Sequence, residues 1–205
     1  MASIDSMKSL LVDELRDIYD AEKRLTKAIP KLAKKAVNDQ LRSALEQHLE
    51  ETEQQVQRLE QAFDHLGERA KAKPCAGMRG IIEEGNEHVG EDYDDDDLRD
   101  AVIIGSAQRV EHYEIAAYGT AIAHARLLEQ QDVVELLEES LGEEKAADAM
   151  LTEIAESVVN LEAAQENAGD EEDESSSSRR LSSSSTRSTA ANRSRRRSTR
   201  GARRT

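Results

Sequence analysis

The 205-residue sequence contains one cysteine, two prolines, one phenylalanine, four tyrosines and no tryptophan. A single cysteine, Cys75, cannot form an internal disulfide, so the fold must depend on its packed core. The scarcity of proline, in a body rich in Ala, Leu, Glu, Lys and Gln, favours helices and predicts an all-α protein. No apolar run approaches the roughly 20 residues of a membrane span, and residues 1–17 lack the apolar stretch of a signal peptide. We therefore expect a cytoplasmic protein with no membrane partner.

The net charge of −15 combines two unlike segments. Residues 1–165 carry 37 acidic and 18 basic side chains, whereas residues 166–205 carry six acidic residues and ten arginines. The second segment consists mainly of serine, threonine and arginine. It cannot bury enough surface to offset an ordering entropy of about 1–2 kcal/mol per residue. The sequence thus predicts a folded domain over residues 1–162 and a disordered tail over residues 163–205, acidic at first and then rich in Ser and Arg.

Four long amphipathic segments are predicted to be helices, over about residues 7–36, 40–66, 98–130 and 132–160. Asp132 and Glu135 resemble a capping box at the start of the fourth segment. Short turns join the first segment to the second and the third to the fourth. The connection over residues 67–97 is much longer, contains a short helical pattern at 78–89, and could run the length of a bundle. This order of loops is typical of a ferritin-like four-helix bundle with a long crossover.

Each predicted helix carries polar residues in the middle of its apolar face. The face of the first helix reads Leu11, Leu15, Ile18, Glu22, Leu25, Ile29, with a glutamate in the place of a leucine. On the other three helices the polar residues come in pairs three or four positions apart, which lie on one side of a helix. The full set is Glu22, His48 with Glu51, Glu111 with Glu114, and Glu144 with Asp148. Because all seven lie near mid-helix, we expect bundle packing to bring them to one level.

Six carboxylates and an imidazole in a water-poor core require neutralisation. An unpaired buried ion costs several kcal/mol, while the stability of a whole domain is only about 5–15 kcal/mol. Protonation of coupled carboxyl groups could neutralise two or three of them, and salt bridges or a hydrogen-bond network around His48 are the structural alternative. Two divalent cations would supply four positive charges and prefer oxygen and imidazole ligands. The pattern therefore predicts a dinuclear metal site with these seven residues as candidate ligands.

Four strings of residues resemble a known family. They are D-I-Y-D-A-E-K-R-L at 17–25, H-L-E-E-T at 48–52, V-E-H-Y-E-I-A-A-Y-G-T at 110–120 and E-E-K-A-A-D at 143–148. Through them, about residues 7–160 resemble the YciE/YciF family of bacterial ferritin-like proteins. The resemblance implies a ferritin-like bundle with a dinuclear metal centre, a homodimer and an association with stress responses. It implies nothing about the tail.

The metal-ligand pattern departs from that of most di-iron bundles, which carry Glu-x-x-His on two helices. Here the second helix has the reverse order, His48-x-x-Glu51, and the fourth has Glu144 and Asp148 without histidine. We expect two metal ions, iron first, with manganese or magnesium as alternatives for so carboxylate-rich a site. Two functions remain open: a metal-binding stress protein that oxidises Fe(II) or consumes peroxide, and a non-catalytic helical scaffold. The arginine-rich tail could contact nucleic acid or acidic partners.

Overall fold

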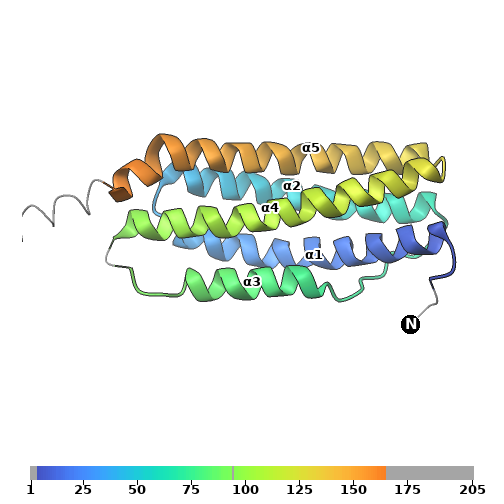
Figure 1. Ribbon diagram of the computed structural model, residues 1–205, viewed down its shortest axis with the longest axis horizontal. Helices are drawn as coiled ribbons and strands as arrows, with labels where there is room; N and C mark the ends of the chain where they lie inside the picture. Colours follow the sequence, from blue (N-terminus) through green and yellow to red (C-terminus); the bar gives the residue numbers. More distant parts are fainter. Residues whose placement is uncertain (1–3, 94, 165–205) are drawn as a thin grey trace, which may run out of the picture. The chain divides into compact units, whose positions relative to one another are not determined.

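The computed structural model describes residues 4–93 and 95–164, and within them the chain forms helices and no strand. Four long helices lie side by side as a bundle (Figure 1): α1 (Met7–Lys35), α2 (Asp39–His65), α4 (Asp96–Leu127) and α5 (Gln131–Ile154), the last continuing into a π-helical turn, η1 (Ala155–Val159). The shorter α3 (Ala76–His88) lies in the connection between α2 and α4 and packs against α1 and α4. The predicted all-α, ferritin-like bundle with a fifth helix in its crossover is confirmed. Of the predicted disordered tail over residues 163–205, residues 165–205 lie outside the described residues. Residues 163 and 164 still belong to the helical segment that follows η1, and Ala163 is buried, so the predicted boundary falls inside a helix.

Local capping residues determine where the first two helices begin. Ser6 and Ser9 form a reciprocal capping box, in which the backbone N–H of Ser9 donates to Ser6 Oγ at 3.1 Å. The side chain of Asn38 accepts two backbone N–H groups from the first turn of α2. Asp100 of α4 is fully buried and accepts the backbone N–H groups of Val37 and Asn38 at 3.0 and 2.6 Å. These bonds anchor the α1–α2 turn to α4.

The predicted capping box of Asp132 and Glu135 is wrong. Helix α5 begins at Gln131, and the residue before it, Gln130, makes no side-chain capping hydrogen bond. Glu129 has φ 57°, a left-handed conformation that ends α4. The chain then enters α5 at once, so Asp132 is already inside the helix, and Glu135 accepts a hydrogen bond from the Gln131 side chain at 3.1 Å.

The apolar core consists of two clusters at different levels of the bundle. One includes Leu25 of α1 and Leu45 of α2, together with residues of α3. The other includes Ile18 of α1 and Phe63 of α2. Glu22 lies between Ile18 and Leu25 along α1 and is fully buried. The polar residues predicted from the sequence therefore occupy a layer between two apolar halves. In the described residues no helix combines the length and the apolarity needed to cross a membrane.

Candidate metal centre

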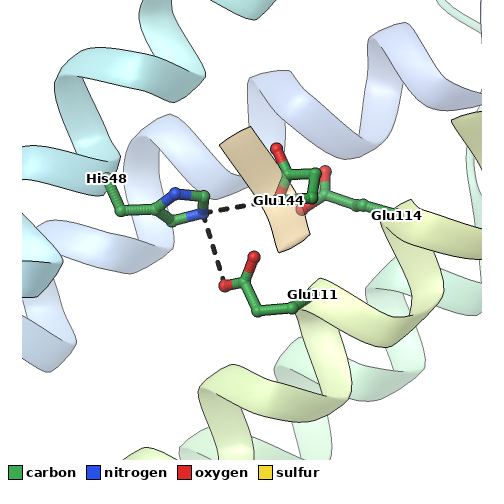
Figure 2. A group of neighbouring side chains, drawn as sticks. All are labelled: His48, Glu111, Glu114 and Glu144. Atoms are coloured by element: carbon green, nitrogen blue, oxygen red, sulfur yellow. Dashed lines mark ion pairs between the residues drawn. The ribbon is translucent and has the colours of Figure 1, made fainter. Parts of the chain in front are cut away.

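Four buried side chains from three helices converge at this level. His48 comes from α2, Glu111 and Glu114 from α4, and Glu144 from α5. Each offers one ligand atom, and these atoms all lie within 4.8 Å of one another. Figure 2 shows the imidazole of His48 pointing at the carboxylates of Glu111 and Glu144, with Glu114 behind them. The exposed fractions of these residues do not exceed 6%, so solvent does not screen their charges.

The distances from His48 Nε2 to the two nearest carboxylates are too long for good hydrogen bonds. His48 Nε2 lies 3.4 Å from Glu111 Oε1 and 3.8 Å from Glu144 Oε2, whereas an N–H···O bond is usually about 2.7–3.2 Å long. With metal–ligand bonds of about 2.0–2.2 Å in a tetrahedral site, neighbouring ligand atoms on one ion lie about 3.3–3.6 Å apart. The spacing around His48 is therefore closer to that of ligands around a cation than to that of a hydrogen-bonded pair.

Glu22 adds a fifth buried group from α1. Its side chain is fully buried, and Tyr118 Oη donates a hydrogen bond to Glu22 Oε1 at 2.5 Å. The charges of Glu144 and Glu114 both interact electrostatically with it. We call Glu22, His48, Glu111, Glu114 and Glu144 the buried cluster. It contains one carboxylate from α1, two from α4 and one from α5, with the histidine from α2.

Burial and mutual repulsion make these carboxyl groups hard to ionise. Burial first, and then the charge of Glu144, raises the pKa of Glu22 well above its usual value. Burial also dominates at Glu111, where the neighbouring Glu144 raises the pKa further. At Glu114 burial is followed by the charges of Glu22 and Glu144, and its pKa is raised as well. Without a cation, the cluster therefore holds protons, which a bound cation would displace.

The buried cluster also contains many polar atoms with no hydrogen-bond partner. Among the described residues, seven such atoms belong to it: Glu22 Oε2, both ring nitrogens of His48, Glu111 Oε2, both carboxylate oxygens of Glu114, and Glu144 Oε2. Each unsatisfied buried group costs about 1–3 kcal/mol. Oxygen and imidazole nitrogen are donors that iron and manganese accept, so this set of atoms fits a metal centre.

The two other predicted ligands, Glu51 and Asp148, lie at the edge of the cluster. Glu51 Oε2 is 3.5 Å from His48 Nδ1, and its side chain is 25% exposed. The neighbouring imidazole of His48 lowers the pKa of Glu51. Asp148 turns toward α4, where it accepts a hydrogen bond from Gln108 at 3.2 Å and lies 3.4 Å from His112. Four residues advance a helix by about 400°, so Asp148 points about 40° away from Glu144.

Two buried polar residues of α2, Gln55 and Arg58, bind α5 from outside the cluster, and Gln55 contacts Glu144 itself. Gln55 Nε2 donates to Glu144 Oε1, and to Glu143 Oε2 at 3.0 Å. Arg58 donates to Glu143, and to Ser140 Oγ at 3.0 Å. Gln55 lies on the apolar face of the second predicted helix, and this position could have indicated that its side chain is buried near the site. Arg58 gave none, because a long basic side chain is usually solvent-exposed.

Comparisons with known proteins place this arrangement in a family. The protein-family model described as "Domain of unknown function (DUF892)" matches residues 6–164 of this chain. The chain is also 41% identical over 162 residues to Protein YciF of Escherichia coli (strain K12), an alignment that covers 78% of this chain and 97% of YciF. The chain belongs to the DUF892 family. The match contains every residue of the buried cluster, and the predicted resemblance to YciE/YciF proteins is confirmed.

Solved structures show the same bundle. The crystal structure of the E. coli stress protein YciF matches at 42% identity and a TM-score of 0.73, covering 77% of this chain and 99% of that chain. YcfI from Rhodopseudomonas palustris, described as a structural protein, matches at 46% identity and a TM-score of 0.72, covering 73% and 95%. A Xanthomonas campestris protein with 23% identity and a TM-score of 0.62 shares the fold alone, over 79% of this chain and 99% of its own. The fold of this chain is thus shared with all three solved structures.

Proposed function

We propose that this chain is a metal-binding protein of the stress response, and that its buried cluster holds two divalent metal ions. The observation that carries the proposal is the set of seven unpartnered nitrogen and oxygen atoms inside the bundle. Glu22, His48, Glu111, Glu114 and Glu144 would hold the ions. The role in stress is supported by YciF, whose structure is titled that of a stress protein.

Iron or manganese suits this donor set best, because the ligands are mainly carboxylates with a single imidazole. A bound iron pair would supply redox chemistry toward Fe(II) oxidation or peroxide consumption. The chain itself contributes the enclosure and the fixed position of the ligands. Gln55 holds Glu144 through its amide, and Tyr118 holds Glu22 through its hydroxyl. Ligands fixed in this way lose little conformational freedom when an ion binds.

Metal stoichiometry of the full chain tests the proposal. Protein purified without chelator, and then loaded anaerobically with Fe(II) or with Mn(II), should contain about two ions per chain. At about 100 times the dissociation constant, each independent site should stabilise the fold by about 2.7 kcal/mol. A chain that binds neither ion, with a melting temperature unmoved by both, would show that the cluster is not a metal centre.

A second function is favoured by one comparison, since YcfI is described as a structural protein. In that case the bundle would be a non-catalytic scaffold, and its core acids would stay protonated. The scaffold function predicts a fully stable chain in chelator and no gain of stability with metal. The metal-binding function predicts the opposite on both counts, so one calorimetric comparison separates them.

We also propose that the protein acts as a homodimer and that its arginine-rich C-terminal segment contacts nucleic acid or acidic partners. The ten arginines of residues 166–205 support the second part, and these residues lie outside both the DUF892 match and the described part of the chain. Deleting 166–205 should abolish polyanion binding and leave metal content unchanged. The bound fraction in the full chain should fall steeply with salt, as expected for phosphate contacts. Sedimentation equilibrium of both forms tests the dimer.

A further inference from the structure

A small cavity reaches the buried cluster from the side of the bundle that α3 covers. Its walls are mainly aliphatic: Leu25 and Ile29 from α1, Ile81 and Ile82 from α3, and Ala107 and Val110 from α4. At its inner end lie His48 and Glu111, which belong to the buried cluster. These two are the ionisable residues in its lining. Asn86 and Ser106 are the uncharged polar residues of the lining, so an ion entering by this side would lose hydration without gaining a charged partner along the walls.

The size of this cavity limits what it can hold. Its volume is about 30 Å³, and about 10–15 Å³ measured in the same way is needed to hold one water molecule. One molecule of two heavy atoms therefore fits, while an organic substrate does not. Ser106 lines the cavity, and its buried Oγ has no hydrogen-bond partner among the described residues. This hydroxyl is available to a small molecule that carries an oxygen atom.

A second small cavity reaches the same two residues from the opposite side, between α2 and α5. It also has a volume of about 30 Å³, but Gln47 and Glu51 line it beside His48 and Glu111. Glu51 is partly exposed and places a carboxylate there. A cation approaching the cluster is attracted by the Glu51 carboxylate on this side, whereas on the other side the walls before His48 and Glu111 carry only the uncharged Ser106 and Asn86 among aliphatic residues. The two cavities thus differ in chemistry although they end at the same histidine.

We propose that the cavity under α3 is a binding and entry site for a small uncharged molecule of two heavy atoms, of the dioxygen or hydrogen peroxide class, next to the metal centre. One part of this proposal, that the molecule meets a metal centre at the inner end of the cavity, rests on the metal-binding function proposed above. The binding of the molecule in the cavity does not depend on that function. Access for neutral molecules is thereby separated from access for cations.

The test uses a variant that fills the cavity without touching the buried cluster. Ala28 lines the cavity and is half-buried, so Ala28→Leu extends an aliphatic side chain into it from α1. Ala44→Leu is the matched control, because Ala44 is a half-buried alanine that lines the opposite cavity. Ile82→Phe narrows the α3 side from the other wall and serves if Ala28→Leu does not fold.

Xenon is the first probe, because it reports on the cavity with or without metal. Crystals of the full chain pressurised with xenon should show an atom beside Ile82 and Ala107 in the wild type and in Ala44→Leu. That atom should be missing in Ala28→Leu and in Ile82→Phe. Absence of xenon from the wild type, or its persistence in both filled variants, would overturn the proposal.

Nitric oxide, a neutral molecule of two heavy atoms, is the second probe. It is added anaerobically to chains loaded with Fe(II), and the rate of the absorbance change is followed by stopped flow. Ala28→Leu should lower this rate about tenfold, which corresponds to about 1.4 kcal/mol on the entry barrier, while Ala44→Leu keeps the wild-type rate and both variants keep the wild-type iron content. Equal rates in all chains would refute the entry site and leave metal binding intact. A wild type that binds no Fe(II) would refute the proposed function, and xenon alone would then decide the cavity.

Discussion

Replacing Glu111 by glutamine should change the stability of the protein in opposite directions with and without metal. Glu111 is 2% exposed, its Oε1 lies 3.4 Å from His48 Nε2, and its Oε2 has no hydrogen-bond partner. Burial and the neighbouring Glu144 raise its pKa well above the usual value. Glutamine keeps the shape of the side chain but can carry no charge. It therefore removes both the cost of keeping a buried acid protonated near neutral pH and one candidate ligand.

The size of the effect follows from these two losses. In chelator, relief of a poorly satisfied buried acid should be worth about 1–2 kcal/mol near neutral pH. For a folded domain of this size each kcal/mol shifts the melting temperature by about 2–4 °C, so Glu111→Gln should melt about 2–8 °C above the wild type. With Mn(II) at about 100 times its wild-type dissociation constant, the wild type gains about 2.7 kcal/mol per site. The variant should lose most of that gain and melt below the wild type.

Scanning calorimetry in chelator and in Mn(II), together with elemental analysis of the metal content, measures both effects. Glu46→Gln is the matched control, because Glu46 is an exposed glutamate of α2, and it should change stability by no more than about 0.5 kcal/mol in either condition. If Glu111→Gln is less stable than the wild type in chelator by about 3 kcal/mol or more, Glu111 is a structural acid paired with a charged His48. Glu111 would then not be a metal ligand.

Three further outcomes are expected. Three glutamates of the buried cluster have pKa values raised above 4.5, so above that pH the folded chain binds more protons than the unfolded chain. The denaturant concentration at the unfolding midpoint, measured in chelator, should therefore fall as the pH rises above about 4.5. A midpoint that rises with pH through this range would contradict the raised pKa values. Arg58→Met should destabilise by about 1–3 kcal/mol in urea titrations, since it leaves the partly buried Glu143 with the Gln55 amide but no cation. Arg79→Met, at an exposed pair, should cost no more than about 1 kcal/mol. Equal losses would show that Arg58 is not an internal partner. In thermal melts, Gly77→Ala should destabilise the fold by about 1–3 kcal/mol, because the new Cβ would lie 2.6 Å from the Tyr113 ring. Gly80→Ala, with no neighbour within 4 Å, should stabilise it by about 0.5–1 kcal/mol. If Gly77→Ala leaves the stability unchanged, α3 can move away from α4.

The sequence by itself determined the helices and the level of the site. A repeat of apolar residues every three or four positions is a local property of the chain, and it specifies which face of each helix is buried. A glutamate in such a repeat, such as Glu22, is then buried with it, and the lengths of the connections determined the order of the bundle. The apolar pattern did not predict where α5 begins. Glu129 adopts a left-handed conformation that ends α4, and α5 starts at Gln131, so Asp132 lies inside the helix and cannot cap it.

Only the tertiary structure decided which polar residues meet. The apolar periodicity predicts the direction of a side chain around its helix only to within some tens of degrees. That uncertainty is large enough to hide the difference between Glu114, which is 1% exposed, and Asp148, whose side chain is 24% exposed and bonds to Gln108. The residue that holds Glu144 from outside the cluster, Gln55, comes from a different helix and lies 89 residues away in the sequence. The cavity under α3 likewise depends on how four helices pack together, because its walls are formed by side chains that share no local pattern. Distances between helices are set by the packing of whole side chains, and no spacing along a single helix contains them.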